Sequence, residues 1–389
     1  MKSEEAPQTG SRFLWLFALA WAGGAVAYVP FLTILLPLRV VAIAGDDSVR
    51  VLGFITFFGA VAASIGNILF GWLSDRSADR RPWVAAGLLI SLTLLVSVPV
   101  GRDPLSIVTL VVCWQLALNM MLGPLSAWAA DRVPRHKTGF LGGLMALSPA
   151  LGALSGVIAT VPGLASPNQR LWLVAAMVAT CVTPVILFVG RTPPAQARPE
   201  EAPPPRRFAA RMWLARLLVQ IAEAALFAYL LIYFRTLDPG VDESKIARLF
   251  GAVLAAALPV AIFVGHRADR SARPARPLGI CACCSAAGLL AMSAASNVGQ
   301  AVAAYVLFGL ATTVFLSLHS GLTLRVLPDP AHRGRDLGVF NLTNTVPSLI
   351  MPWLTIAIVP QRGFAALFVV LAILAAASAA LLLSLKRLD

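Results

Sequence analysis

Long apolar runs alternate with short polar segments along almost the whole chain. About a dozen runs extend over roughly 18 to 28 residues, enough for a helix to cross a hydrocarbon core about 30 Å thick. The pattern therefore predicts an all-α membrane protein with twelve transmembrane helices. The predicted spans are residues 13–38, 50–73, 83–101, 105–130, 139–162, 171–190, 211–234, 247–266, 278–295, 299–326, 337–359 and 364–385.

The composition excludes a soluble protein. Of the 389 residues, 58% are hydrophobic and 13% are charged, and the mean hydropathy is +0.80. Soluble domains carry about one-quarter charged residues, and no soluble fold could bury so much apolar surface.

One long polar stretch, residues 191–207, interrupts the series of spans. It contains six prolines in seventeen residues, which is typical of a semi-rigid, solvated linker. The linker divides the chain into two halves, 1–190 and 208–389, with six predicted spans each.

The two halves share sequence in corresponding loops. Residues 71–78 read GWLSDRSA after the second span, and residues 265–272 read GHRADRSA after the eighth, an offset of 194 residues. A second echo follows the fourth and tenth spans, where RVP at 132–134 corresponds to RVLP at 325–328. Two loops in register indicate an internal duplication.

The basic residues report membrane orientation. The isoelectric point is near 10.5, which would also suit nucleic-acid binding. With the amino terminus placed inside, however, 23 of the 31 Lys and Arg residues fall on the cytoplasmic side, as the positive-inside rule requires. We therefore expect both termini in the cytoplasm, a lipid bilayer as surroundings and no nucleic-acid partner.

The sequence indicates no enzyme, metal or cofactor site. All five cysteines lie within predicted spans, and the cluster at 281–284 lacks the His or acidic neighbours of a metal site. Metalloprotease and serine-hydrolase motifs are absent from the sequence. We expect packing cysteines and a monomeric chain.

The loop after the second span resembles the signature loop of the major facilitator superfamily, a motif of the form G-x-L-x-D-R followed by basic residues. Ala78 stands where glycine is usual, and Asp79 where a basic residue is common. A weaker resemblance, through residues 80–83 and 333–338, links the chain to bacterial branches near the sugar-cation symporters. The residues that match the signature are Gly71, Leu73, Asp75, Arg76, Arg80 and Arg81.

The resemblance implies two pseudo-symmetric six-helix bundles in a bacterial cytoplasmic membrane, and a gate between them. Gly71 would allow close helix approach, and Asp75, held by Arg76 or Arg80, would close the cytoplasmic face against residues 336–338. By the repeat, Asp269 and Arg270 would act in the same way near Gly139. Alternatively, these charges are topology signals at solvated loop ends.

The seventh span carries the strongest candidate for proton coupling. Arg216, Gln220, Glu223 and Phe227 recur at helical spacing and share one face. Seventeen of the eighteen acidic residues fall in loops or termini, which leaves Glu223 as the one carboxylate in the predicted apolar core. Burial favours the neutral form of a carboxyl group, so Glu223 could bind and release a proton. Alternatively, Glu223 is paired with Arg216 or hydrogen-bonded as a structural tie between the halves.

Further polar residues in the spans are candidates for cargo binding. His319 can titrate near neutrality, which makes it a second proton-coupling candidate, although a lone His is more often a satisfied packing residue. Aromatic packing explains Tyr28 as well as a cavity does. The substrate-binding candidates are Gln115, Asn119, Arg216, Gln220, Asn341, Asn344 and Tyr28.

These features favour a secondary transporter working by alternating access and coupled to protons. Few charges lie in the spans, so the expected cargo is a small, mostly neutral or amphipathic organic molecule. Residues 148–153 resemble the proline-containing bend of antiporters, which favours efflux slightly. The alternatives are a symporter for sugars or other polar nutrients and a non-transporting assembly protein with the same fold.

Overall fold

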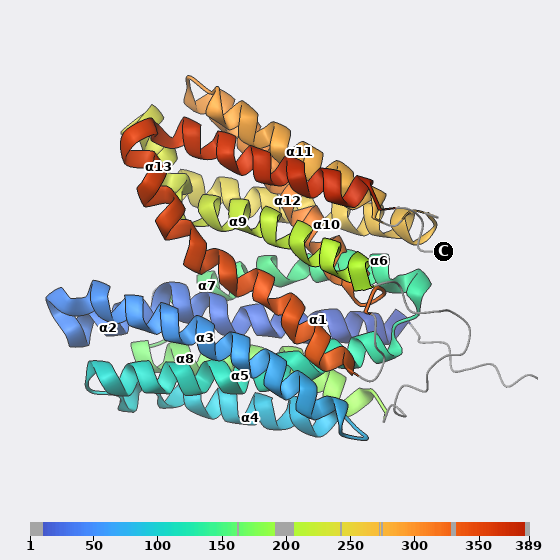
Figure 1. Ribbon diagram of the computed structural model, residues 1–389. Coiled ribbons are helices and arrows are strands. Elements are labelled where there is room, and N and C mark those ends of the chain that lie inside the picture. The colour runs from blue at the N-terminus through green and yellow to red at the C-terminus, as the bar shows by residue number, and fades with distance from the viewer. Residues whose placement is uncertain are drawn as a thin grey trace, which may run out of the picture.

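The computed structural model describes residues 11–161, 163–190, 206–241, 243–271, 273, 275–327 and 332–385. Their regular structure is helical, and the helices form two bundles (Figure 1). The predicted linker lies outside the described residues except for Arg206 and Arg207, which begin a helix. The fold class predicted from the sequence is confirmed.

The first half contains eight α-helices and shorter helical turns. It begins with one long bent helix, formed by α1, a π-helical turn and α2. The elements are α1 (Ser11–Pro30), η1 (Phe31–Leu35), α2 (Leu36–Ala44), η2 (Gly45–Asp47), α3 (Ser48–Asp75), α4 (Arg81–Ser97), η3 (Val98–Val100), α5 (Pro104–Arg132), η4 (Arg135–Lys137), α6 (Thr138–Met145), α7 (Leu147–Thr160) and α8 (Pro167–Phe188).

The second half contains five longer helices. They are α9 (Arg206–Leu237), α10 (Glu243–Asp269), α11 (Arg276–Ser293), α12 (Val298–Thr323) and α13 (Arg333–Leu383). Among the described residues, ten helical stretches are long and apolar enough to cross a membrane, and α9 makes an eleventh if its two parts, which meet at 54°, are one span. The helix α13 contains the last two predicted spans, which turn into each other at Gly363 with φ of 72°.

Two spans differ from the sequence prediction for identifiable reasons. The first continues to Ala44 rather than 38, because the guanidinium of Arg39 donates to the backbone carbonyl oxygens of Pro99 (2.7 Å) and Gly101 (3.2 Å). The fifth is broken at Ala146 into α6 and α7. Pro149 has no N–H for the carbonyl of Met145, so the helical ladder is interrupted there.

The two halves meet through glycines near one end of the bundle, the predicted cytoplasmic end. A side chain added at any of eight helical glycines would strike atoms of the opposite half. Burial in lipid gives helices no hydrophobic reason to associate, so close packing of small residues is the means by which they adhere. These glycines are Gly71, Gly139, Gly142, Gly143, Gly265, Gly321, Gly334 and Gly338.

The glycine contacts repeat with the symmetry of the sequence. Gly71 of α3 touches the backbone of Gly334 on α13, and Gly265 of α10 touches that of Gly139 on α6. One turn further along, a Cβ at Gly338 would lie 2.5 Å from Cα of Ile68, and one at Gly143 would lie 2.7 Å from Cα of Ile262. In each half, therefore, a helix with glycines near its start packs against a helix of the other half, as Figure 1 shows for α13 beside α3 and for α6 beside α10.

We predict that Gly71→Leu opens this end of the bundle, because the added side chain overlaps the backbone of Gly334. Overpacking costs about 1–3 kcal/mol, so the open population should rise about tenfold or more. The measurement is the labelling rate of Ser126→Cys, a buried position between the halves, by an impermeant thiol reagent applied from the predicted cytoplasmic side. The five native cysteines are first replaced by alanine.

Gly53→Leu is the matched control, because a Cβ at this position of the same helix meets no atom within 4 Å. Equal labelling rates in the Gly71→Leu and Gly53→Leu proteins would contradict the steric account of closure.

Candidate functional site

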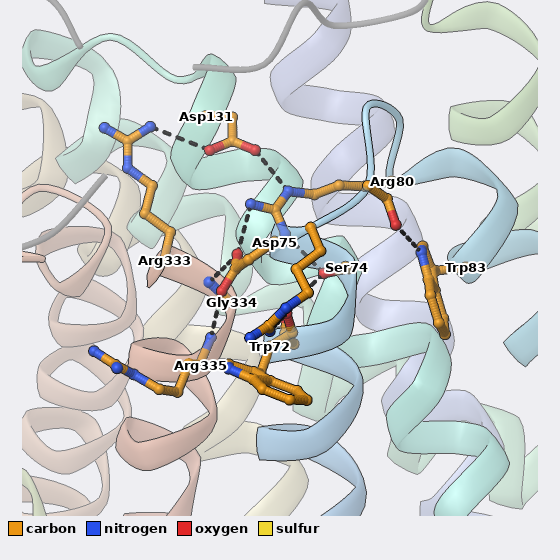
Figure 2. Close-up of polar contacts among 12 residues, drawn as sticks. Trp72, Ser74, Asp75, Arg80, Trp83, Asp131, Arg333, Gly334 and Arg335 are labelled. Atoms are coloured by element: carbon orange, nitrogen blue, oxygen red, sulfur yellow. Dashed lines mark hydrogen bonds and ion pairs between the residues drawn. The ribbon is translucent and has the colours of Figure 1, made fainter. Parts of the chain in front are cut away.

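Asp75 caps a helix that belongs to the other half. Its Oδ1 accepts a hydrogen bond from the backbone N–H of Gly334 (2.8 Å), and its Oδ2 accepts one from Arg335 (3.1 Å) (Figure 2). These are the second and third residues of α13, whose N–H groups have no partner within their own helix. The negative carboxylate also complements the positive end of the helix dipole.

A row of alternating charges supports this cap. Arg80 binds Asp75 Oδ1 through Nη2 (2.9 Å) and Asp131 Oδ2 through Nε (2.6 Å), and Asp131 Oδ1 in turn binds Nη1 of Arg333 (3.1 Å) (Figure 2). The side chains of Asp75, Asp131 and Arg80 are at most 10% exposed, so water and salt screen the row only weakly. The row thus joins the halves at two points.

The duplicated loop makes a second cap. Oδ1 of Asp269 accepts from the backbone N–H of Gly139 (2.7 Å), and Oδ2 accepts from that of Phe140 (2.8 Å). These are again the second and third residues of their helix, α6. The ring of His266 stacks on Phe140 with centroids 4.4 Å apart. We call the Asp75 and Asp269 contacts the two clasps.

The arginines predicted to assist the clasps take different positions. Arg76 is exposed and lies over the Trp72 ring of its own helix, with its guanidinium carbon 3.5 Å from the ring centroid. Arg270 is exposed at the end of α10. Arg80 is the arginine that binds Asp75.

Sequence reasoning missed Asp131 and Arg333. Asp131 directly precedes the repeated RVP segment, and Arg333 begins the basic turn before α13. Both signals were present in the sequence, but the pairing of residues 202 positions apart appears only in the fold.

Arg216 on α9 is held by polar groups of α12 and α13. Its Nη1 donates to Oγ of Ser320 (2.9 Å) and lies 3.3 Å from Nδ1 of His319, while Nη2 donates to Oδ1 of Asn344 (3.2 Å). Gln220, one turn along α9, donates to the same Asn344 oxygen (3.2 Å). The structure thus brings four of the predicted site residues into one cluster.

The contacts of His319 fix its tautomer. Nε2 lies 2.9 Å from the backbone oxygen of Met212, which can only accept, so Nε2 carries the hydrogen. Nδ1 faces Arg216, which can only donate, so Nδ1 is the acceptor. A second ring proton would oppose the guanidinium, and this arrangement favours the packing interpretation of His319 over proton coupling.

Asn119, a binding candidate of the first half, has its hydrogen bonds within that half. Asn119 is buried, accepts from Nδ2 of Asn67 (3.0 Å) and donates to the backbone oxygen of Gln115 (2.8 Å). Asn119 therefore serves as a tie between α3 and α5. The side chain of Gln115 is half-buried next to Gly59.

Glu223 lies between the halves, beyond ion-pair distance of Arg216 but within its electrostatic range. It is half-buried, and its carboxylate forms no hydrogen bond or ion pair with other described residues. Tyr28 on α1 and Tyr305 on α12 are within electrostatic range of it. Tyr28 is 42% exposed and belongs to the opposite half.

A cavity of about 60 Å³ lies between the halves, next to the clasps. Asn341 and Asn344 of α13 line it, so the eleventh span contributes to the cavity together with the first, fourth and tenth. No group of three or more metal-binding side chains occurs in the part of the chain that the structure describes. The lining residues are Phe17, Trp21, Asn67, Ser126, Met145, Arg216, Ser320, Thr323, Leu324, Leu337, Phe340, Asn341 and Asn344.

Comparison with known proteins gives one family and several similar structures. The sequence model described as Major Facilitator Superfamily matches residues 6–157 and 212–389. None of the curated proteins compared matches the chain.

Three solved structures illustrate the structural similarity. The human organic anion transporter MFSD10 (TETRAN) aligns with a TM-score of 0.77 and 14% identity, over 97% of this chain and 100% of that one. A bacterial homologue of the iron transporter ferroportin, in an outward-facing state, aligns with a TM-score of 0.73 and 14% identity, over 96% of this chain and 98% of that one. The proton:xylose symporter XylE, bound to 6-bromo-6-deoxy-D-glucose, aligns with a TM-score of 0.71 and 13% identity, over 95% of both chains.

We predict that Asp75→Asn loosens the first clasp, because the amide loses the charge and one of the two acceptor oxygens. Hydrogen bonds to charged groups contribute about 1.5–3 kcal/mol, so Ser126→Cys should label about tenfold faster from the predicted cytoplasmic side. Asp269→Asn should act in the same direction.

Asp103→Asn is the matched control for both variants. Asp103 caps α5 by accepting from the N–H of Ser106 (3.0 Å), but this contact stays within one half. If Asp75→Asn labelled no faster than Asp103→Asn, the clasp would have no part in closure.

Proposed function

The chain belongs to the major facilitator superfamily of secondary transporters, and we propose that it couples the movement of a small amphipathic organic molecule to protons. The membrane is the bacterial cytoplasmic membrane, and the clasps lie on the cytoplasmic side. The orientation rests on the positive-inside distribution of Lys and Arg.

The observation that supports proton coupling is the isolation of Glu223. Its carboxylate lies between the halves, half-buried, and forms no ion pair with another described residue, although the charge of Arg216 acts on it from a longer distance. Placing a carboxylate of this kind within a membrane costs free energy. Ionisable residues at such positions therefore mark functional sites. Taking up a proton removes the cost of burying its charge, so the proton occupancy of Glu223 can change as its surroundings change from wet to dry.

Alternating access supplies that change of surroundings. With both clasps closed, the glycine contacts seal the predicted cytoplasmic end, and Glu223 would be accessible only from the opposite side. Rocking of the two bundles would open the clasps and expose Glu223 and the cavity to the cytoplasm. The proton and the cargo would then cross in the same conformational cycle.

The cavity supports an amphipathic cargo. Trp21 and Phe17 contribute aromatic surface from α1, and Asn341 and Asn344 contribute amides from α13. The break between α6 and α7 beside Pro149 is a slight reason to favour efflux. Uptake of a sugar is the second candidate, supported by the same amides.

We predict that Glu223→Gln abolishes gradient-driven transport. Glutamine has a similar shape, but its side-chain amide does not bind or release a proton near neutral pH. Ligands are first found by thermal stabilisation of the purified protein, and their flux is then measured in proteoliposomes with and without a pH gradient. The parent protein should concentrate the ligand when the gradient is present, while the variant should only equilibrate it.

Asp238→Asn is the matched control, since Asp238 is exposed just beyond the end of α9. Gradient-driven accumulation that survives Glu223→Gln would overturn the role of Glu223. Stable partner proteins that co-purify, without flux of any stabilising ligand, would instead favour the assembly alternative.

A further inference from the structure

The cavity between the halves carries one ionisable side chain. Its lining consists of aromatic and aliphatic residues, hydroxyls and amides, together with the guanidinium of Arg216. This cation forms no ion pair with any described carboxylate, and the nearest acidic influence on it is the more distant Glu223. Glu223 lies seven positions along the same helix, which corresponds to about 10 Å of rise.

The guanidinium also keeps hydrogen-bonding capacity toward a ligand. The contacts that the structure describes occupy Nη1 (Leu316 O, His319 Nδ1 and Ser320 Oγ) and one direction of Nη2 (Asn344 Oδ1). Nε and the second Nη2 hydrogen have no acceptor in the described part of the chain. Two N–H groups of one planar guanidinium match the two oxygens of a carboxylate.

The side chains that bind Arg216 hold it in position without cancelling its charge. His319 faces it as a neutral ring, and Asn344 is itself held by Gln220 and by its own bond to Asn341 Oδ1 (2.7 Å). All of these partners are uncharged. The arrangement positions a positive charge for recognition, because a purely structural arginine in a membrane would be expected to have an acidic partner.

An apolar surface faces this polar one. Trp21 lines the same cavity as Arg216, and Tyr28 lies within electrostatic range of Glu223. Trp21 and Tyr28 are seven residues apart on α1, as Arg216 and Glu223 are on α9, so each pair shares one face of its helix and spans about 10 Å along it. The exposed side chain of Tyr28 lies at the end of this path that is away from the clasps.

We propose that the cargo is an amphipathic molecule with a single carboxylate, which binds to Arg216 while its apolar body lies along Trp21 and Tyr28. This inference rests on the proposed transport function and names its substrate class. The cavity of about 60 Å³ accommodates the carboxylate head, and the body extends toward Glu223. A cation would meet the guanidinium unfavourably, and a neutral oxygen would accept from it without the opposite charge and the bidentate geometry of a carboxylate.

A charge series tests the substrate class. The probes are 4-phenylbutyrate, indole-3-acetate and octanoate, each with the amide and the primary amine of the same skeleton. Thermal stabilisation of the purified, full-length protein is measured at pH 7.5. At least one acid should stabilise the protein at a concentration tenfold or more below that of its amide, and the amines should give no shift.

Arg216→Gln should remove the preference for acid over amide, and Arg216→Lys should retain part of it. Arg211→Gln is the matched control, because Arg211 is exposed on the same helix. Because the parent protein alone gives the acid-to-amide ratio, the series remains decisive if Arg216→Gln does not fold. Equal stabilisation by amide or amine, or no stabilisation by any acid up to 10 mM, would overturn the proposal.

The outcome is separable from that of the proposed transport function. Binding in detergent needs no proton gradient, so an acid preference that depends on Arg216 stands even if Glu223→Gln leaves transport unchanged. Conversely, proton-driven flux of neutral ligands with no preference for acids would support proton coupling and refute the proposal that the cargo carries a carboxylate.

Discussion

Two helices in this protein begin without a cap of their own and are capped from the other half. Neither α6 nor α13 is capped by the side chain at its N-cap position, Lys137 or His332. The first N–H groups of a helix need acceptors, and here Asp269 and Asp75 supply them across the interface. The carboxylates can reach those groups only when the glycines allow the backbones to touch. Closure of this end is therefore a single event, in which packing and capping form together.

The two clasps have the same geometry but different electrostatics. The first includes Arg80, Asp131 and Arg333, which connect the halves through a partly buried row of charges. The second copy has Pro274 where the first has Arg80, and its capping carboxylate has Arg325 and His266 within electrostatic range. Breaking the first clasp separates Asp131 from Arg333 as well as removing the cap, whereas breaking the second separates mainly a cap and a ring stack. The two clasps can therefore differ in the free energy needed to open them, although their geometry is the same.

The sequence predicts the parts of the fold that depend on local pattern. Spans, the duplication and the positions of Gly71, Asp75, Gly139 and Asp269 follow from hydropathy, composition and repeat offset. The sequence could not predict which side chains pair, because pairing depends on the rotation of each helix about its axis and on the depth of each residue in the membrane. Asn119 has the right residue type and spacing for a binding residue, yet it bonds to Asn67 on the neighbouring helix. His319 has a suitable intrinsic proton affinity, yet a carbonyl and a guanidinium determine its tautomer.

The helices that the clasps hold are also helices that line the cavity. Gly334 and Asn344 lie ten residues apart on α13, about 15 Å along a rigid helix, and Met145 ends the helix that begins beside Asp269. The contacts of Asn344 with Arg216 and the cap that Asp75 provides therefore act on the same helix. A ligand shifts such an equilibrium only by its difference in affinity for the two states. That difference has to be comparable with the capping bonds, which are hydrogen bonds to charged groups of about 1.5–3 kcal/mol each. A ligand held by dispersion alone would contact α13 about equally before and after rocking. One that binds the guanidinium of Arg216 beside Asn344 acts on the polar contacts that join α9 to α13, so charge recognition in the cavity is the interaction best suited to release the clasps.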